Sequence, residues 1–147
     1  MIQTYSLLFI PLASLIITQA IKVVIDLIHH RSVSMNSYGG MPSSHSALFA
    51  SLVFMAGLTA GWASFEFAVS VILYLVIVRD AAGIRQHLGR HGQLLKDLLI
   101  EHKKDHQHNI PHEKIVTRLG HTPLQIVMGT ICGLVITALI SFMIGLW

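Results

Sequence analysis

The sequence predicts an all-α integral membrane protein with four transmembrane helices, additional cytoplasmic amphipathic helices and an acid phosphatase/haloperoxidase-like helical core. Of its 147 residues, 53% are hydrophobic and only 12% are charged. The mean hydropathy is +0.65, which is typical of membrane proteins. The chain contains four separate apolar runs, and the first covers roughly the 20 residues that a bilayer requires. The length favours a single membrane domain, 1–147.

The spanning helices are expected at about residues 7–28, 44–60, 65–79 and 122–146. Lys22 and Asp26 interrupt the last turns of the first run. The second run continues from His45 and ends where Gly57–Gly61 and Trp62 predict a turn at an interface. The last run, which begins at Pro123, carries no charge.

A polar segment of about 80–120 separates the third run from the fourth. Spaced apolar residues over 81–100 predict a partly amphipathic helix broken near Gly89 and Gly92. We expect a loop over 102–111 and a short helix over 112–119.

The charges indicate an orientation. All ten Lys and Arg residues fall within 22–45 or 79–121, whereas the opposite side carries only Glu66. The positive-inside rule makes the charged side cytoplasmic and both termini external, and we expect a bacterial inner membrane. Nucleic-acid binding is not expected, because no basic stripe is interleaved with aromatic residues.

The stretch Gly39-Gly40-Met41-Pro42-Ser43-Ser44-His45-Ser46 predicts an anion site at the start of a membrane helix. Pro42 suits the first helical position, and Ser43 or Ser44 can cap the helix. The free N–H groups and the positive dipole end attract phosphate, and His45 can transfer a proton near neutral pH. The alternative is an ordinary N-cap after a flexible loop.

Cationic residues gather on the same side. An ionisable residue inside a spanning segment suggests a role for Lys22, although a lysine extended to the interface and paired with Asp26 is the alternative. Small residues beneath Arg79, Asp80 and Arg85 favour a constructed polar site over a solvated face. Guanidinium groups and an ammonium group together neutralise a phosphate.

His121 opens the last helix and shares a face with Gln125 four residues later. A capping histidine is the usual interpretation of such a residue alone. Beside a second histidine at another helix start, His121 becomes a candidate nucleophile or base.

Two motifs resemble a known family. Pro42-Ser43-Ser44-His45 and the stretch from His121 to Gly129 are similar to the Pro-Ser-Gly-His and His-x-x-x-Asp-Val-x-x-Gly motifs of the type 2 phosphatidic acid phosphatase and vanadium haloperoxidase superfamily, in its short divergent membrane branch. The resemblance implies that His121 takes the phosphoryl group and that His45 protonates the leaving oxygen.

The resemblance also implies the remaining roles. Lys22, Ser43 and the Ser44 amide would hold phosphate oxygens. Gln125 stands where the family has aspartate, so Asp80 is a candidate to support the imidazole instead. Arg31 follows Lys22 by nine residues, and Ile115 stands where the family has a second arginine, so that charge would come from Arg79, Arg85 or Arg118.

The first functional hypothesis is therefore a lipid phosphate or pyrophosphate phosphatase that needs no metal or other cofactor, acting for example on a polyprenyl phosphate or phosphatidic acid. The alternative is a non-catalytic lipid-phosphate binder or carrier. A third hypothesis is a metal-binding protein, although a solvated loop explains its histidines better: His102, His106, His108 and His112. A homodimer is compatible with so thin a scaffold, but no motif indicates one.

Overall fold

The computed structural model describes residues 2–29, 40–105 and 120–146. These residues form only helices and their connections, which confirms the predicted all-α class. The helices are α1 (Ile2–Ile28), α2 (Ser44–Ala60), α3 (Phe65–Ala82), α4 (Ile84–Asp105) and α5 (Pro123–Met143).

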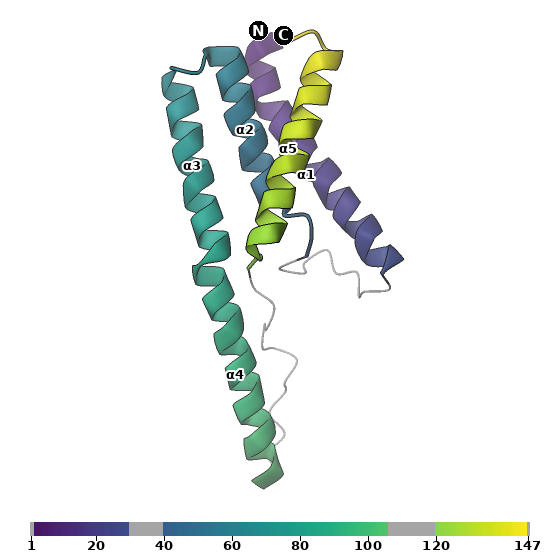
Figure 1. Ribbon diagram of the computed structural model, residues 1–147, viewed down its shortest axis with the longest axis vertical. Coiled ribbons are helices and arrows are strands. Elements are labelled where there is room, and N and C mark those ends of the chain that lie inside the picture. Colours follow the sequence, from purple (N-terminus) through teal and green to yellow (C-terminus); the bar gives the residue numbers. More distant parts are fainter. Residues whose placement is uncertain (1, 30–39, 106–119, 147) are drawn as a thin grey trace.

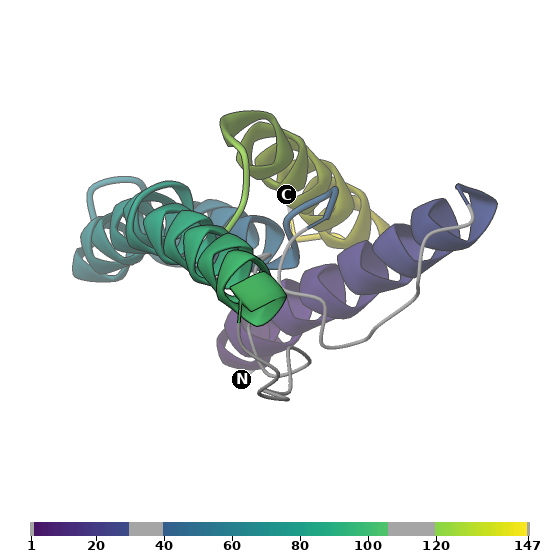
Figure 2. The ribbon, with the colours of Figure 1, turned by 90° about the horizontal axis from the view of Figure 1, so that it is seen from below.

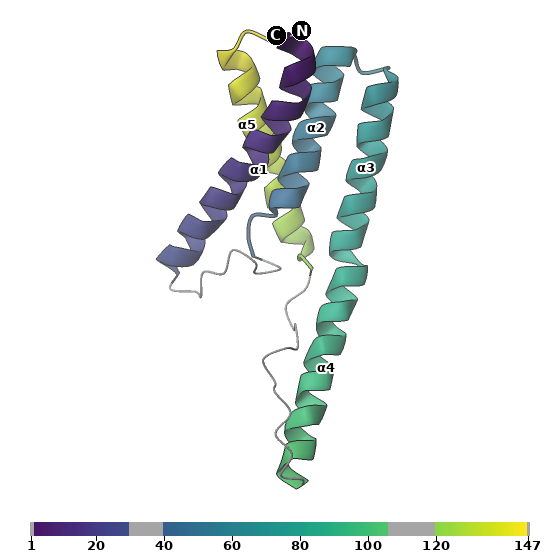
Figure 3. The ribbon, with the colours of Figure 1, turned by 180° about the vertical axis from the view of Figure 1, so that it is seen from behind.

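Helix α2 is the centre of the bundle and contacts α1, α3 and α5. Helices α1 and α3 lie on opposite sides of it (Figures 2 and 3). Both chain ends lie at one end of the bundle, and α4 extends beyond the other end (Figure 1). The starts of α2 and α5 lie at this second end.

Helices α2 and α5 run parallel with a four-residue register. Ser43 meets Gly129 and Ala47 meets Gly133, and the glycines are required because a Cβ at either one would collide with backbone of α2. Further along, Thr137 donates a hydrogen bond to Ser51, and the hydroxyl of Ser141 lies 3.4 Å from the sulfur of Met55. Small residues at every fourth position therefore bring the two backbones close together.

Helix α1 turns a polar stripe toward the interior. Buried residues follow one another at intervals of four from Ser6 through Ile10, Ser14 and Thr18 to Lys22. The hydroxyls of Ser14 and Thr18 have no hydrogen-bond partner in the described part of the chain. Most buried side chains are thus small, and many of them are polar, whereas large apolar side chains cover the outside.

That apolar exterior suits lipid. Helices α1 and α5, together with α3 and its continuation into α4, are long and apolar enough to cross a membrane, and α2 is a shorter apolar helix of 17 residues. At the α2–α3 turn, Trp62 packs edge-on against Phe54 and Phe67. Such an aromatic cluster is typical of a membrane interface.

The structure corrects several expected boundaries. Helix α2 continues through Gly57 to Ala60, and the turn comes after it. Helix α4 continues through Gly89 and Gly92, and the chain leaves helical geometry at Gly83 instead (φ −108°, ψ −93°). His102 lies within α4 rather than in a loop. The short helix expected over 112–119 falls outside the described residues.

Candidate functional site

The starts of α2 and α5 lie side by side. Ser43 is the N-cap of α2, and its hydroxyl accepts hydrogen bonds from the N–H of Ser46 (3.3 Å) and the hydroxyl of Ser46 (2.9 Å). Its own N–H donates to the carbonyl oxygen of Gln125 in the first turn of α5 (3.1 Å). Because the helices are parallel, their positive dipole ends converge here.

The prediction that Pro42 occupies the first helical position was wrong. The helix begins at Ser44, so Pro42 precedes the N-cap and does not occupy the first helical position. Capping by Ser43 is confirmed. Ser44, the first helical residue, is half-buried, and the N–H groups of a first helical turn have no partner within their own helix.

Helix α1 brings Lys22 to this end of the bundle. Lys22 is only 6% exposed, so it is not a lysine that extends to the solvent. A Cβ built on Gly40 would lie 2.7 Å from its Cε atom, which places the lysine stem directly against the chain that precedes α2. Asp26, one turn further along α1, acts on Lys22 electrostatically.

His121 lies between α3 and α5. Its backbone N–H donates to the carbonyl oxygen of Ala81 near the end of α3 (3.1 Å). Its Nδ1 atom is buried and makes no hydrogen bond with the described residues. A buried ring nitrogen without a partner costs free energy, so it marks a position where a ligand would be stabilising.

The surroundings of His121 bring the predicted groups together. Burial lowers the pKa of His121 from its ordinary value of 6.5, and the positive charges of Lys22 and His45 lower it further. Polar groups of the Gln125 side chain and the Gly40 backbone act in the opposite direction. His121, His45 and Lys22 therefore share one electrostatic environment, and the imidazole of His121 is kept neutral near pH 7.

His45 and Gln125 differ in how they are held. His45 lies in the first turn of α2 and is exposed. Gln125 completes a capping box, because its Oε1 atom accepts from the N–H of Thr122 (2.9 Å) and its N–H donates to the hydroxyl of Thr122 (3.4 Å). This oxygen therefore already has a backbone donor.

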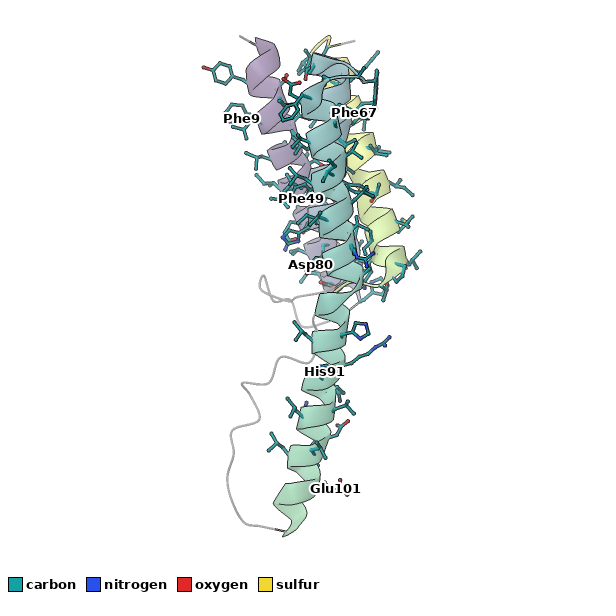
Figure 4. The ribbon with its side chains drawn as sticks, turned by 90° about the vertical axis from the view of Figure 1, so that its left-hand side faces the viewer. Phe9, Phe49, Phe67, Asp80, His91 and Glu101 are labelled. Carbon is teal, nitrogen blue, oxygen red and sulfur yellow. The ribbon has the colours of Figure 1, made fainter. Side chains whose placement is uncertain are left out.

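The remaining predicted site residues are the arginines and Asp80. Arg79 is exposed in the last turn of α3, and Asp80 is half-buried beside Ala81. Figure 4 shows Asp80 where the bundle ends and α4 begins to extend alone. The side chain of Arg85 falls outside the described part of the structure, as do Arg31 and Arg118.

The sequence patterns do not indicate how Gly40, Ala81 and Gly133 shape the site. Gly40 has a φ of +103° and leaves room for Lys22. Ala81 anchors His121, and Gly133 permits the close approach of α2 and α5. The four-residue interval between Gly129 and Gly133 is the one signal that points to the last of them.

A metal centre has no visible support in the residues described here, since they contain no group of three His, Cys, Asp or Glu side chains that could hold a metal ion. His106, His108 and His112 lie outside the described residues, as does the side chain of His102. The solvated loop expected there stays a prediction.

Comparison with known proteins agrees with the membrane architecture. A family model described as "Divergent PAP2 family" matches residues 4–136. The chain is also similar to the uncharacterized membrane protein YuiD of Bacillus subtilis (strain 168), with 32% identity over 143 residues, covering 89% of this chain and 90% of the relative. No solved structure gives a significant match.

Proposed function

Because the chain belongs to the Divergent PAP2 family, we propose that it is a membrane phosphatase that hydrolyses a lipid phosphate or pyrophosphate through a histidine nucleophile. One observation carries this proposal. The buried, unpartnered ring nitrogen of His121 shares its environment with Lys22 and His45 at the paired starts of two helices. A phosphate would provide the missing partner.

Binding of the phosphate relies on charge and on helix ends. Lys22 supplies a buried ammonium group, and the first N–H groups of α2, at Ser44 and His45, supply donors. The hydroxyl of Ser43 accepts from Ser46 and keeps its own proton to donate. Arg79, Arg85 and Arg31 complete the proposed set of cations, since phosphoryl transfer depends chiefly on positioning and charge neutralisation.

The chemistry proceeds in two displacements. A lone pair on the neutral ring of His121 attacks phosphorus, the bond from phosphorus to the lipid oxygen breaks, and His45 donates a proton to that oxygen. A water molecule then gives its proton to His45 and attacks the phosphohistidine. This step releases inorganic phosphate, frees the ring of His121 and returns His45 to the protonated form with which it began. Asp80 and Gln125 are the proposed supports of the imidazole ring of His121.

The location of the site favours a lipid substrate. The candidate site lies where the apolar helices α2 and α5 begin, so a headgroup can reach it while the tail stays in the bilayer. The distribution of Lys and Arg supports a cytoplasmic location for this side by the positive-inside rule, and the bacterial relative supports an inner membrane as the proposed location.

The test uses the purified full chain in nanodiscs with a panel that includes polyprenyl phosphate, polyprenyl pyrophosphate and phosphatidic acid. We expect phosphate release, and an acid-labile phosphoprotein when the phosphorus is labelled. His121→Ala should abolish both, and His45→Ala should slow release. His91→Ala, which changes an exposed histidine of α4, is the matched control. Release that survives His121→Ala overturns the proposal.

A second candidate function is a non-catalytic lipid-phosphate binder or carrier. The homodimer is a separate proposal. The binder is favoured by Gln125, an uncharged amide whose oxygen already accepts from Thr122. A neutral amide stabilises an imidazolium less than a carboxylate does. Binding of the lipid phosphate without turnover, weakened by Lys22→Met and unaffected by His121→Ala, would support the binder. Light scattering of the same sample gives the oligomeric state.

A further inference from the structure

Helix α4 presents leucines that no described part of the protein covers. Leu94, Leu95 and Leu98 are 61%, 56% and 62% exposed. Figure 4 shows the α4 side chains, among them His91 and Glu101, projecting beyond the bundle with no other helix of the described residues beside them. Exposed apolar groups in such number on one helix call for a partner.

The leucines of α4 share one face. Leu88, Leu95 and Leu99 follow at intervals of seven and four, and Leu98 lies three residues after Leu95. The opposite face carries Arg90, Gln93 and Asp97, and Gln93 donates a 3.5 Å hydrogen bond to Asp97. The helix is therefore amphipathic with a broad apolar face, as in helices that lie in a membrane surface.

The length of α3 places the start of α4 at such a surface. Helix α3 has 18 residues, which at about 1.5 Å per residue spans roughly 27 Å, close to the hydrocarbon thickness of about 30 Å. A straight continuation would carry the leucines of α4 away from the lipid and into water. A bend at the junction would instead return them to the interface.

Gly83 provides the junction for that bend. Its backbone leaves helical values, and a Cβ there would lie 2.8 Å from the carbonyl oxygen of Arg79, so a side chain does not fit. Helix α4 also carries five Lys and Arg residues against three Asp and Glu residues. This excess of positive charge complements anionic headgroups.

From these observations we propose that α4 docks along the headgroup layer of an anionic leaflet, on the side of the candidate site, with its leucine face in the lipid. The partner is the lipid surface itself. The inference does not depend on the chemistry of the candidate site. Docking of α4 would bring the α3–α4 junction into contact with the membrane surface. Ala81, whose carbonyl oxygen accepts from the N–H of His121, lies at this junction.

The test measures which face of α4 meets lipid in the full chain. Cys132, the one cysteine, is replaced by alanine, and single nitroxide labels are placed at Leu95 or Leu98 and, as matched controls, at Gln93 or Asp97. Collision with oxygen and with a water-soluble nickel chelate is measured in nanodiscs of phosphatidylcholine with and without phosphatidylglycerol.

With phosphatidylglycerol, we expect a several-fold higher ratio of oxygen to nickel accessibility at Leu95 and Leu98 than at Gln93 and Asp97. High salt or Lys96→Glu should reduce the difference. Equal nickel accessibility at all four positions overturns the proposal, because α4 would then stand in water. Spin–spin broadening between copies at Leu95 also overturns it, because the face would then cover a second copy of the chain.

Discussion

The carbonyl oxygen of Gln125 accepts a hydrogen bond from the backbone N–H of Ser43 at 3.1 Å. The bond fastens the N-cap of α2 to the first turn of α5. Two helix starts, separated by about half of the chain, are thereby held as one unit in which His45 and His121 share an environment.

Gly40→Ala should weaken anion binding, because the new Cβ would lie 2.7 Å from the Cε atom of Lys22. Gly61→Ala is a matched control, since Gly61 has a similar φ (+98° against +103°) but nothing within 4 Å of its Cβ position. Both substitutions should cost on the order of 1 kcal/mol in backbone strain. Only Gly40→Ala should raise the dissociation constant for vanadate measured by calorimetry. Equal effects on vanadate binding would contradict the close contact with Lys22.

Much of the fold could be predicted from the sequence because its signals are local. Apolar length marks the spanning helices, and the caps at Ser43 and Thr122 need only their own neighbours. The glycines of α4 show the limit of such signals. A helical glycine costs only about 1 kcal/mol, which did not break the helix at Gly89 or Gly92.

The arrangement of the site is less accessible to sequence reasoning. The register of α2 against α5 depends on which backbones can approach, and this becomes evident only when Gly129 and Gly133 meet Ser43 and Ala47. Motifs indicated that His45 and His121 belong together. The anchoring of His121 by Ala81 is a backbone contact, which no side-chain pattern records.

Gly133→Ala should destabilise the bundle, because its Cβ would collide with the backbone of Ala47. Overpacking typically costs about 1–3 kcal/mol, and the helix propensity of alanine returns up to about 1 kcal/mol. Val135→Ile adds a methylene group on the exposed side of the same helix, where Val135 is 51% exposed, and should be nearly neutral. Thermal unfolding in detergent measures the difference. An unchanged midpoint for Gly133→Ala would argue against the register.

Thr137→Val should destabilise the α2–α5 pair by removing the hydrogen bond to the buried hydroxyl of Ser51. Hydrogen bonds between membrane helices average about 0.6 kcal/mol and reach about 1.7 kcal/mol. Thr59→Val is the control, because the hydroxyl of Thr59 bonds to Met55 of its own helix. A double-mutant cycle with Ser51→Ala isolates the pair. A coupling energy of zero would show that the two hydroxyls act independently.

The titration of His121 tests the electrostatics of the whole site. Burial lowers its pKa below 6.5, so the ring should be neutral at pH 6.5 and lose activity as a nucleophile only in more acidic solution. Lys22→Met removes a positive charge that lowers this pKa, so the midpoint should move to higher pH.

Gln125→Glu should move the midpoint in the same direction, because a carboxylate beside the ring favours the imidazolium. The substitution keeps the capping box, since glutamate also accepts from the N–H of Thr122. Nitrogen NMR of the imidazole ring measures the titration midpoint of His121, and the signal is assigned because it disappears in His121→Asn. Lys96→Met on α4 is the control and should leave this midpoint unchanged. If His121 is the nucleophile, the acid limb of kcat/KM should follow the NMR midpoint in each variant. A limb that stays fixed while the midpoint moves would assign the reaction to a different group.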